Sequence, residues 1–215
     1  MTRYVMVADL RRCIGCQTCT AACKMANGTP PGVQWRRVVD MEIGTYPDVK
    51  RVFMPVGCQH CSNPPCLDVC PSGATQQRDD GIVNIDYDIC IGCASCAVAC
   101  PYGARYLVHE EQYAYGDRPT EDEKTNYNNK YLGVANKCNF CAEKIDAGVA
   151  NGLTPGKDPE ATPHCVNSCI SGAMTFGDID DQESNVSTLL RNSKHYRLKE
   201  EEGTNPGFYY IWDEA

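Results

Sequence analysis

The sequence is poor in large apolar side chains and contains no long hydrophobic run. Leu, Ile, Val and Phe together make up only 38 of the 215 residues, and the formal net charge is −8 at pH 7. Such a composition is typical of chains that cannot fold on apolar burial alone. Because no window approaches eighteen consecutive apolar residues, the sequence predicts no transmembrane helix and no direct insertion into a membrane.

Several functional motifs are also missing. The chain contains no Gly-rich G-x-G-x-x-G, no P-loop and no recognisable Ser/His/Asp arrangement. The acidic net charge argues against a nucleic-acid partner, since phosphate binding needs a basic surface. The opening residues MTRYVMVADL are interrupted by Arg3 and Asp9, and no apolar run follows Arg11 and Arg12. We therefore expect the chain to have no export signal of its own.

Cysteine, in contrast, is abundant, with 16 residues. Metal centres could supply the missing part of the core, because the free energy of metal binding then becomes free energy of folding. A disulfide scaffold would also need many cysteines. Such scaffolds belong to secreted proteins, however, and the missing export signal disfavours that interpretation.

The cysteines form four groups of four, with none left over. Two groups share the spacing C-x2-C-x2-C-x3-C: Cys13, Cys16, Cys19 and Cys23, and then Cys90, Cys93, Cys96 and Cys100. The second group along the chain has the spacing C-x2-C-x4-C-x3-C: Cys58, Cys61, Cys66 and Cys70. The fourth group is a C-x2-C pair and a C-x3-C pair with 23 residues between them: Cys138, Cys141, Cys165 and Cys169.

These spacings favour iron–sulfur clusters over zinc or disulfides. A C-x2-C-x2-C loop can wrap three corners of a cubane cluster, and the next Cys of the run ligates the neighbouring cluster in bacterial two-cluster ferredoxins. Zinc sites use separate pairs of ligands and do not need an unbroken run of four cysteines. The sequence therefore predicts four 4Fe–4S clusters.

The order of the groups predicts how they pair. The second and third groups lie close together, with a short alternating strand expected over residues 81–86, and residues 58–103 resemble a complete bacterial two-cluster ferredoxin. The first and fourth groups flank this stretch and would pair with each other. We therefore expect an α+β fold of two bacterial-ferredoxin-like units, one inserted in the other, with loop-rich insertions. Residues 58–103 form the inner unit; residues 1–57 and 104–215 form the outer unit with its insertions and C-terminal tail.

An internal repeat supports this arrangement. CIGCQTCTAAC at residues 13–23 matches CIGCASCAVAC at residues 90–100, and CLDVCPSGA matches CVNSCISGA. The offsets of 77 and 80 residues are close, as a duplication requires. Crossed ligation within each unit then gives four ligand sets as hypotheses. They are Cys13, Cys16, Cys19 with Cys169; Cys138, Cys141, Cys165 with Cys23; Cys58, Cys61, Cys66 with Cys100; and Cys90, Cys93, Cys96 with Cys70.

Over nearly its whole length, the chain resembles the four-cluster iron–sulfur (beta) subunits of complex molybdopterin oxidoreductases, such as dimethyl sulfoxide, polysulfide, thiosulfate, tetrathionate and respiratory arsenate reductases. The matching blocks are YVMVADLRRCIGC, GTYPDVKRVFMPVGCQHCSNPPCLDVCPSGA, CIGCASCAVACPYGA, KCNFCAEKIDAG and the tail NPGFYYIW. Two features depart from the pattern. Ile170 stands where Pro commonly follows the last Cys, and the 23-residue gap in the fourth group is long and reads as a surface loop.

The resemblance implies a non-catalytic electron-transfer subunit. Its clusters would carry electrons between a molybdopterin-containing (Mo/W) catalytic subunit and a redox partner, which in some relatives is an integral membrane quinol-reactive subunit. The Cys13 cluster would lie nearest the catalytic partner. Relatives without a signal are cytoplasmic, or reach the periplasm by co-export with the catalytic partner. The alternative is a free-standing polyferredoxin or a hydrogenase-type electron carrier, which needs no pterin partner.

Four further expectations concern residues outside the ligand sets. His60 and His164 lie inside ligand loops and could donate hydrogen bonds to cluster sulfur. Five basic residues either offset cluster charge or form surface salt bridges: Lys24, Arg36, Arg37, Lys50 and Arg51. Residues 105–130 are expected to form a hydrated insertion, with a partner-docking surface as the alternative. Residues 181–192 are expected to form a short amphipathic helix with Leu189 and Leu190 facing inward.

Overall fold

The computed structural model describes residues 1–212, and its largest sheet joins the two ends of the chain. The strand order is β8-β1-β10-β9. β1 (Tyr4–Asp9) pairs with β8 (Met174–Asp178) in antiparallel fashion and with β10 (Phe208–Ile211) in parallel fashion, and β10 pairs with β9 (His195–Arg197). β1 is therefore an interior strand, which is why a run such as Val5–Ala8 is fully buried.

Both faces of β1 are covered. Met6 and Ala8 point into the main core, whereas Val5 and Val7 belong to a second core under α7 (Asn185–Arg191). This helix confirms the amphipathic helix expected near residues 181–192, although it begins later because the Ser184 side chain caps it. Leu190 is buried, and Leu189 is half-buried against the same core.

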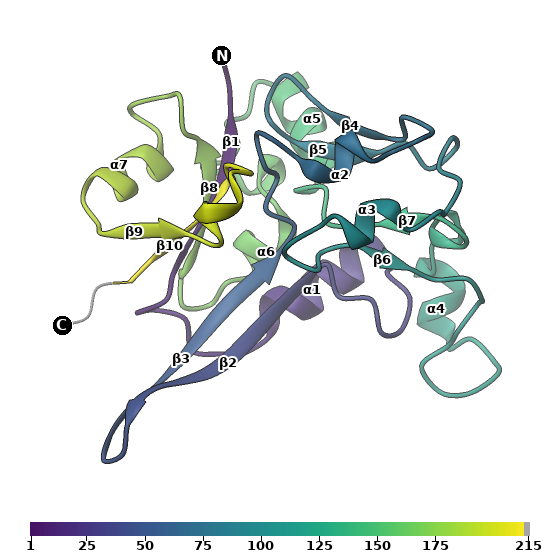
Figure 1. The fold of residues 1–215 in the computed structure, drawn as a ribbon, viewed down its shortest axis with the longest axis horizontal. Helices are drawn as coiled ribbons and strands as arrows, with labels where there is room; N and C mark the ends of the chain where they lie inside the picture. Colours follow the sequence, from purple (N-terminus) through teal and green to yellow (C-terminus); the bar gives the residue numbers. More distant parts are fainter. Residues whose placement is uncertain (213–215) are drawn as a thin grey trace.

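The short helices bring the cysteine groups together. α1 (Thr18–Asn27), which carries Cys19 and Cys23, packs against α6 (His164–Asn167), which carries Cys165. In the same way α2 (Pro65–Asp68), with Cys66, packs against α3 (Ser95–Val98), with Cys96. The first group thus meets the fourth, and the second meets the third (Figure 1).

Two small sheets lie beside the α2–α3 pair. β4 (Thr75–Gln77) pairs with β5 (Val83–Ile85), and β6 (Tyr106–Leu107) pairs with β7 (Ala135–Asn136). β5 confirms the short strand that the alternating pattern of residues 81–86 predicts. Its burial is uneven, since Val83 is 1% exposed whereas Asn84 and Ile85 are half-buried.

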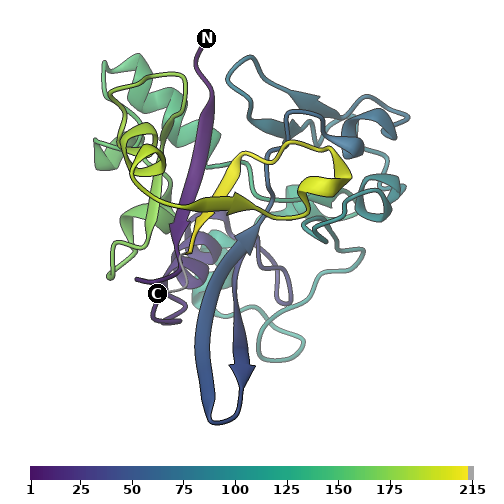
Figure 2. The ribbon, with the colours of Figure 1, turned by 60° about the vertical axis from the view of Figure 1, so that its left-hand side comes forward.

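A long β-hairpin leaves the body of the protein. β2 (Arg36–Thr45) and β3 (Asp48–Gly57) pair over their whole length, from Arg36 opposite Gly57 to Thr45 opposite Asp48. Figures 1 and 2 show this hairpin extending away from the other elements, and at its tip Tyr46 is 90% exposed. Its base is buried, so the hairpin is anchored there and solvated along most of its length.

The two expected insertions differ in structure. Residues 105–130 contain the exposed helix α4 (Glu121–Asn126), followed by η1 (Asn129–Tyr131), so hydration of this segment is confirmed around α4. The 23 residues of the fourth group were expected as a surface loop, and this was wrong. They contain α5 (Ala142–Ala150) and η2 (Pro159–Ala161), and Gly148 lets the two pack so closely that a Cβ there would lie 2.4 Å from Ala161 Cβ.

The remaining short element is η3 (Glu200–Glu202), between β9 and β10. Taken together, the elements form a mixed α+β fold of small sheets and short helices, as expected. Within residues 1–212, no helix has both the length and the apolar character needed to cross a membrane.

Candidate iron–sulfur sites

The two C-x2-C-x2-C loops have the same backbone conformation. Gly15 and Gly92, the third residue of each CIGC motif, have φ values of 71° and 64°, and Gln17 and Ala94 follow at 60° and 63°. Left-handed residues at these positions coil the chain tightly between successive cysteines. Each glycine is also closely packed: a Cβ on Gly92 would lie 2.1 Å from the Gly133 carbonyl oxygen, and one on Gly15 would lie 2.4 Å from the Phe53 ring.

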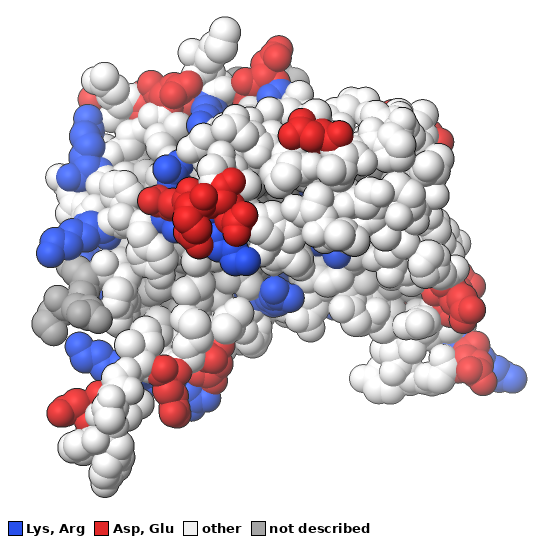
Figure 3. Space-filling view, viewed as in Figure 1, with Lys and Arg blue, Asp and Glu red and all other residues white. Residues whose placement is uncertain are grey.

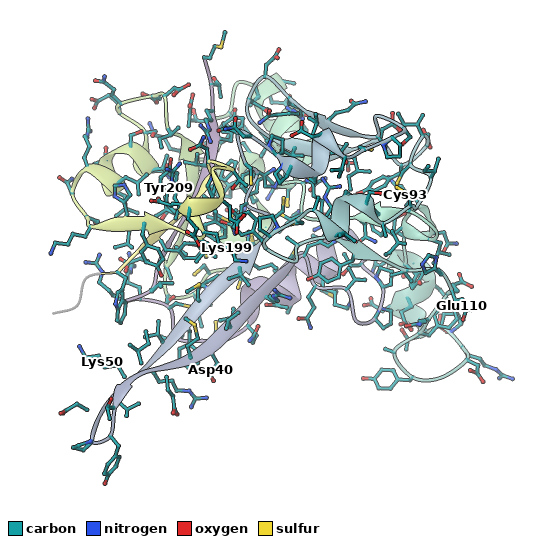
Figure 4. The ribbon with its side chains drawn as sticks, viewed as in Figure 1. Asp40, Lys50, Cys93, Glu110, Lys199 and Tyr209 are labelled. Carbon is teal, nitrogen blue, oxygen red and sulfur yellow. The ribbon has the colours of Figure 1, made fainter. Side chains whose placement is uncertain are left out.

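None of the sixteen cysteines forms a disulfide, and they differ widely in exposure. Only two are exposed, Cys16 and Cys93, which occupy equivalent positions in the repeat. Seven are buried: Cys19, Cys23, Cys61, Cys66, Cys96, Cys138 and Cys165. The other seven are half-buried. Figure 4 shows Cys93 at one side of the molecule, far from the β10 residue Tyr209.

In the outer pair of groups, electrostatic interactions link the cysteines across the groups. Burial raises the pKa of Cys23 far above its ordinary value, and the neighbouring Cys138, Cys165 and Cys141 raise it further. Burial also raises the pKa of Cys13, and Cys169 then contributes more than Cys16, the nearest cysteine in the sequence. Cys23 therefore lies among the fourth-group cysteines, and Cys169 lies beside Cys13.

In the inner pair of groups, cysteines of one group also interact with cysteines of the other. Burial raises the pKa of Cys61 to about 12, and Cys58, Cys66 and Cys100 all act in the same direction. For Cys96, burial is again the main cause of a raised pKa, with Cys90 and Cys70 adding to it. The cysteines around Cys96 also line a small hollow in the structure. Its lining includes Cys70, Cys90, Cys93 and Cys96.

Hydrogen bonds to sulfur repeat between matching cysteine groups. Thr18 Oγ1 donates to Cys16 Sγ at 3.3 Å, and the equivalent side chains of Cys93 and Ser95 are hydrogen-bonded at 3.5 Å. Backbone N–H groups donate to the last Cys of the other two groups, from Thr75 to Cys70 at 3.4 Å and from Ala173 to Cys169 at 3.2 Å. Such bonds stabilise thiolates and tune the potentials of clusters bound by them.

Cys70 shows the size of this effect. Burial alone would raise its pKa, but hydrogen bonds from Thr75, Ser72 and Ala74 outweigh burial and lower the pKa to about 7. Cluster ligation needs thiolates, and these hydrogen bonds favour the thiolate form of Cys70. Buried thiols such as Cys23 gain their negative charge most easily when iron is bound to them.

Three cations are buried among the cysteines. Arg36 is 0% exposed, Lys137 is 1% exposed and Arg105 is 7% exposed. Arg105 donates to Cys66 Sγ at 2.9 Å and to Thr75 Oγ1 at 3.1 Å. Lys137 donates to the backbone carbonyl oxygens of Val83 and Cys138.

Two of the five basic residues singled out in the sequence show the two expected roles. Arg36 is a buried cation near cysteines, whereas Arg51 forms an exposed salt bridge with Asp40 on the hairpin. Lys24 donates to backbone carbonyl oxygens of Thr29 and Pro30, and it also interacts electrostatically with Cys23. Sequence reasoning missed Lys137 and Arg105, although Lys137 directly precedes Cys138.

His60 and Phe140 occupy equivalent positions in the C-x2-C pairs of the second and fourth groups. Both have positive φ, and their rings stack with centroids 3.6 Å apart. His60 Nδ1 accepts a hydrogen bond from the Val83 N–H at 3.1 Å, so the ring proton of a neutral imidazole is on Nε2. Burial, followed by Lys137, Arg36 and Arg105, holds the pKa of His60 well below its usual range. Nε2 has no hydrogen-bond partner within residues 1–212, which leaves it available as a donor.

A single-ion site is a different geometry from a cluster site. In the described part of the chain, no three His, Cys, Asp or Glu side chains converge as they would around one metal ion. Cys70, Cys90, Cys93 and Cys96 instead line a shared hollow. The donor set, the unpaired thiols and the buried cations all fit polynuclear clusters bound by thiolates.

Comparison with known proteins agrees with this chemistry. A family described as "4Fe-4S dicluster domain" matches residues 49–115. A selenate reductase subunit from Mesobacillus selenatarsenatis is 41% identical over 97% of this chain and 72% of its own length. A tetrathionate reductase subunit from Salmonella typhimurium is 40% identical, with the same coverage of 97% and 72%. The arsenate respiratory reductase iron-sulfur subunit ArrB of a Shewanella species is 34% identical over 97% of this chain and 96% of its own length.

The chain belongs to the family of iron–sulfur (beta) subunits of complex molybdopterin oxidoreductases. Members of this family transfer electrons and do not carry the catalytic centre. This confirms the resemblance found in the sequence and favours it over the free-standing polyferredoxin.

Proposed function

We propose that the chain binds four 4Fe–4S clusters in a row and conducts electrons between a molybdopterin-containing catalytic subunit and a second redox partner. The observation that carries this proposal is the pattern of cysteine exposure. The ligand sets of Cys13 and of Cys90 each contain one exposed Cys, whereas the other two sets contain none. A row with buried middle members and one accessible cluster at each end suits entry and exit of electrons at opposite ends.

Neighbouring cysteines support the order of this row. Cys19 of the first set interacts electrostatically with Cys165 of the second set. Cys138 of the second set interacts with Cys58 of the third. Arg105 interacts with both Cys66 of the third set and Cys96 of the fourth. The order is therefore the Cys13 set, the Cys138 set, the Cys58 set and the Cys90 set.

Exposed apolar residues surround both end sites. Ile14 and Ile170 flank the first set and are 59% and 71% exposed. Ile91 and Val98 flank the last set and are 67% and 87% exposed, and Figure 3 shows few charged side chains on the side of the molecule where Figure 4 places Cys93. Apolar patches of this kind suit protein partners that exclude water from the path of the electron. By family resemblance, the Cys13 end faces the catalytic subunit.

The two-unit arrangement is part of the same proposal. Residues 58–103 would be the inner unit, inserted between residues 1–57 and 104–215. Arg78 ties the two units together by donating twice to the Asp146 carboxylate of α5, at 2.8 and 2.6 Å. The segment before β10 also crosses the inner unit, where Lys199 donates to the Pro101 carbonyl oxygen at 2.7 Å (Figure 4).

The proposal extends to the second redox partner and to the compartment in which the chain works. We propose either a soluble electron carrier or an integral membrane quinol-reactive subunit at the Cys90 end. The folded chain would work in the cytoplasm, or in the periplasm after co-export with its catalytic partner.

Metal analysis of anaerobically purified protein tests the cluster count. Four complete ligand sets predict close to sixteen iron and sixteen acid-labile sulfide per chain. Reproducible zinc with little iron would overturn the assignment. Anaerobic co-purification tests the partner: a stoichiometric large subunit containing molybdopterin supports the proposed complex, and a stable monomer without one would support a free-standing polyferredoxin.

A further inference from the structure

Arg36 is a buried cation with almost no polar partner. It is fully buried at the base of β2, and its Nε and Nη1 have no hydrogen-bond partner within residues 1–212. Nη2 contacts Met6 Sδ at 3.0 Å, and the guanidinium carbon lies 4.8 Å from the centroid of the Phe208 ring. A buried charge is strongly unfavourable unless an opposite charge lies close to it.

The counter-charge for Arg36 is not a carboxylate. Among the described residues, no ion pair includes Arg36, and its largest electrostatic interactions are with Cys165, Cys138 and Cys23. These three cysteines belong to the proposed second ligand set. Arg36 also interacts with Cys19 of the first set, so it lies at the junction between the first two sites.

Arg105 occupies the corresponding place in the inner unit. Its guanidinium donates to Cys66 Sγ and interacts with Cys58 and Cys96, which links the third site to the fourth. No carboxylate pairs with it in residues 1–212. Lys137 lies between these two arginines in the row, next to Cys58, Cys66 and Cys138, with two of its protons held by carbonyl oxygens.

A fixed positive charge at a junction has a predictable effect. A reduced cluster carries one more negative charge than the oxidised form, so a nearby cation favours the reduced form and raises the potential. The effect applies to each of the two clusters beside the cation, and burial makes it strong because little water screens the charge. Arginine keeps its charge at any pH at which the protein is folded, so its contribution is constant.

We propose that Arg36 and Arg105 are potential-setting residues, each of which holds the two clusters on either side of it at a higher reduction potential than they would otherwise have. The inference rests on the proposed function, because it assumes that the four ligand sets are filled. Neither arginine ligates a cluster, and both act through their charge.

Redox titration followed by electron paramagnetic resonance tests the proposal in the complete, cluster-loaded complex. Each cluster signal is first assigned with one Cys→Ser variant per ligand set. Arg36→Met should lower the ratio of reduced to oxidised cluster about tenfold at fixed ambient potential, which is about 59 mV for one electron. The Cys138-set cluster should shift most and the Cys13-set cluster less, while the Cys90-set cluster stays unchanged. Arg105→Met should instead shift the Cys58-set and Cys90-set clusters.

Charge-retaining and matched control variants separate charge from structure. Arg36→Lys and Arg105→Lys should restore most of the parental potentials, and Arg51→Met on the exposed hairpin should leave all four unchanged. If Arg36→Met does not assemble, the Arg105→Met titration and the Lys variants decide the question. Parental potentials in a fully loaded Arg105→Met variant, or Lys variants that shift as far as the Met variants, would overturn the proposal. Fewer than four clusters in the parental protein would instead count against the proposed function itself.

Discussion

The first and third cysteine groups have the same spacing but end in different structures. After the first group the helix continues, and α1 covers ten residues with Cys19 and Cys23 on its buried face. After the third group Pro101 follows Cys100, and α3 has only four residues. Proline cannot donate a helical hydrogen bond and disfavours helix at the residue before it. The residue that follows the last cysteine therefore influences the length of the helix beside the site.

The cores of the two regions differ accordingly. α1 contributes Cys19 and Cys23 to the main core, which also holds the aromatic side chains of Phe140, Phe176 and Phe208. The core near α2 and α3 consists of Cys66, Val83, Cys96 and Ala135. Half of its members are cysteines, so this core has little apolar burial apart from its thiols. The two CIGC loops thus share their backbone conformation but lie in different surroundings.

Removal of the clusters should have the largest effect. Ordering each residue costs about 1–2 kcal/mol of backbone entropy. Burial of the few large apolar side chains cannot offset this cost alone. We expect chelation to unfold the chain cooperatively, measured by circular dichroism. Hydrogen exchange during partial cluster loss should show residues 58–103 losing protection before β1, β8 and β10. An apo protein with a native spectrum and a sharp thermal transition would contradict this expectation.

Replacing the last Cys of each run should give the next largest effect. With crossed ligation, Cys23→Ser removes a ligand from the cluster of Cys138, Cys141 and Cys165, and leaves the Cys13 set with four cysteines. Turnover with the physiological electron partner should fail, whereas dye-linked activity that feeds the catalytic subunit directly should largely survive. Electron paramagnetic resonance should show one altered cluster, different from the one altered by Cys100→Ser.

Damage to the Cys13-set cluster in Cys23→Ser would show that each group closes its own cluster. Equal loss of both activities would show that either the order of the row or the pairing is wrong. Because Cys23 is 5% exposed and Cys100 is half-buried, iron content is the necessary control for both variants. Loss of one quarter of the iron is consistent with a local effect.

The sequence predicts the ligand chemistry better than the surrounding structure. Spacing is a local property, so it predicts the cysteine groups, and the alternating residues near β5 predict a strand. The buried cations depend on contacts over long sequence separations. Nothing local distinguishes Arg36 from the neighbouring Arg37, yet the first is fully buried and the second is exposed. They differ because successive side chains of β2 point to opposite faces of the hairpin at its base.

The loop expected in the fourth group failed for a similar reason. Its Gly and Pro residues suggest irregular structure, but Gly148 is placed inside α5 because a larger residue would collide with Ala161. Packing therefore overrides the local preference of the segment. The hairpin β2–β3 carries clear strand residues, but its extension away from the body depends on having no partner sheet beside it, and strand pattern alone does not reveal that.

The two CIGC glycines offer a matched pair of substitutions with a smaller effect. Gly15→Ala and Gly92→Ala both place a side chain at positive φ, which costs about 1–3 kcal/mol. At Gly92 the new Cβ would also collide with the Gly133 backbone carbonyl, whereas at Gly15 it meets the half-buried Phe53 ring on the hairpin. We expect Gly92→Ala to cost about 1–3 kcal/mol more, in the range found for overpacking.

Thermal unfolding of the cluster-loaded protein, with iron release followed in parallel, measures this difference. Phe53→Ala in the Gly15→Ala background is the control, since it makes room for the new methyl group and should recover part of the loss. Equal destabilisation by the two glycine variants would show that backbone strain alone matters.

The smallest expected effect concerns the residue that follows the last cysteine of the second and of the fourth group. Pro71 follows Cys70, and Ile170 follows Cys169, yet the local hydrogen bonds are the same. The Cys70 N–H donates to the Leu67 carbonyl and the Gly73 N–H to the Cys70 carbonyl, at 3.1 and 3.3 Å. Their equivalents donate from Cys169 to Val166 and from Gly172 to Cys169, at 3.1 and 3.0 Å.

The turn after Cys169 thus has the same hydrogen bonds as the turn after Cys70, which contains Pro71. No backbone hydrogen bond of the turn uses the Ile170 N–H, so Ile170→Pro should restrict the unfolded chain without loss in the folded one and stabilise the protein by about 0.4–1 kcal/mol. Ile170→Ala is the control for loss of the exposed side chain, and both are compared by thermal unfolding of the isolated, cluster-loaded subunit. Destabilisation by Pro but not by Ala would mean that the two turns differ in backbone conformation although their hydrogen bonds match.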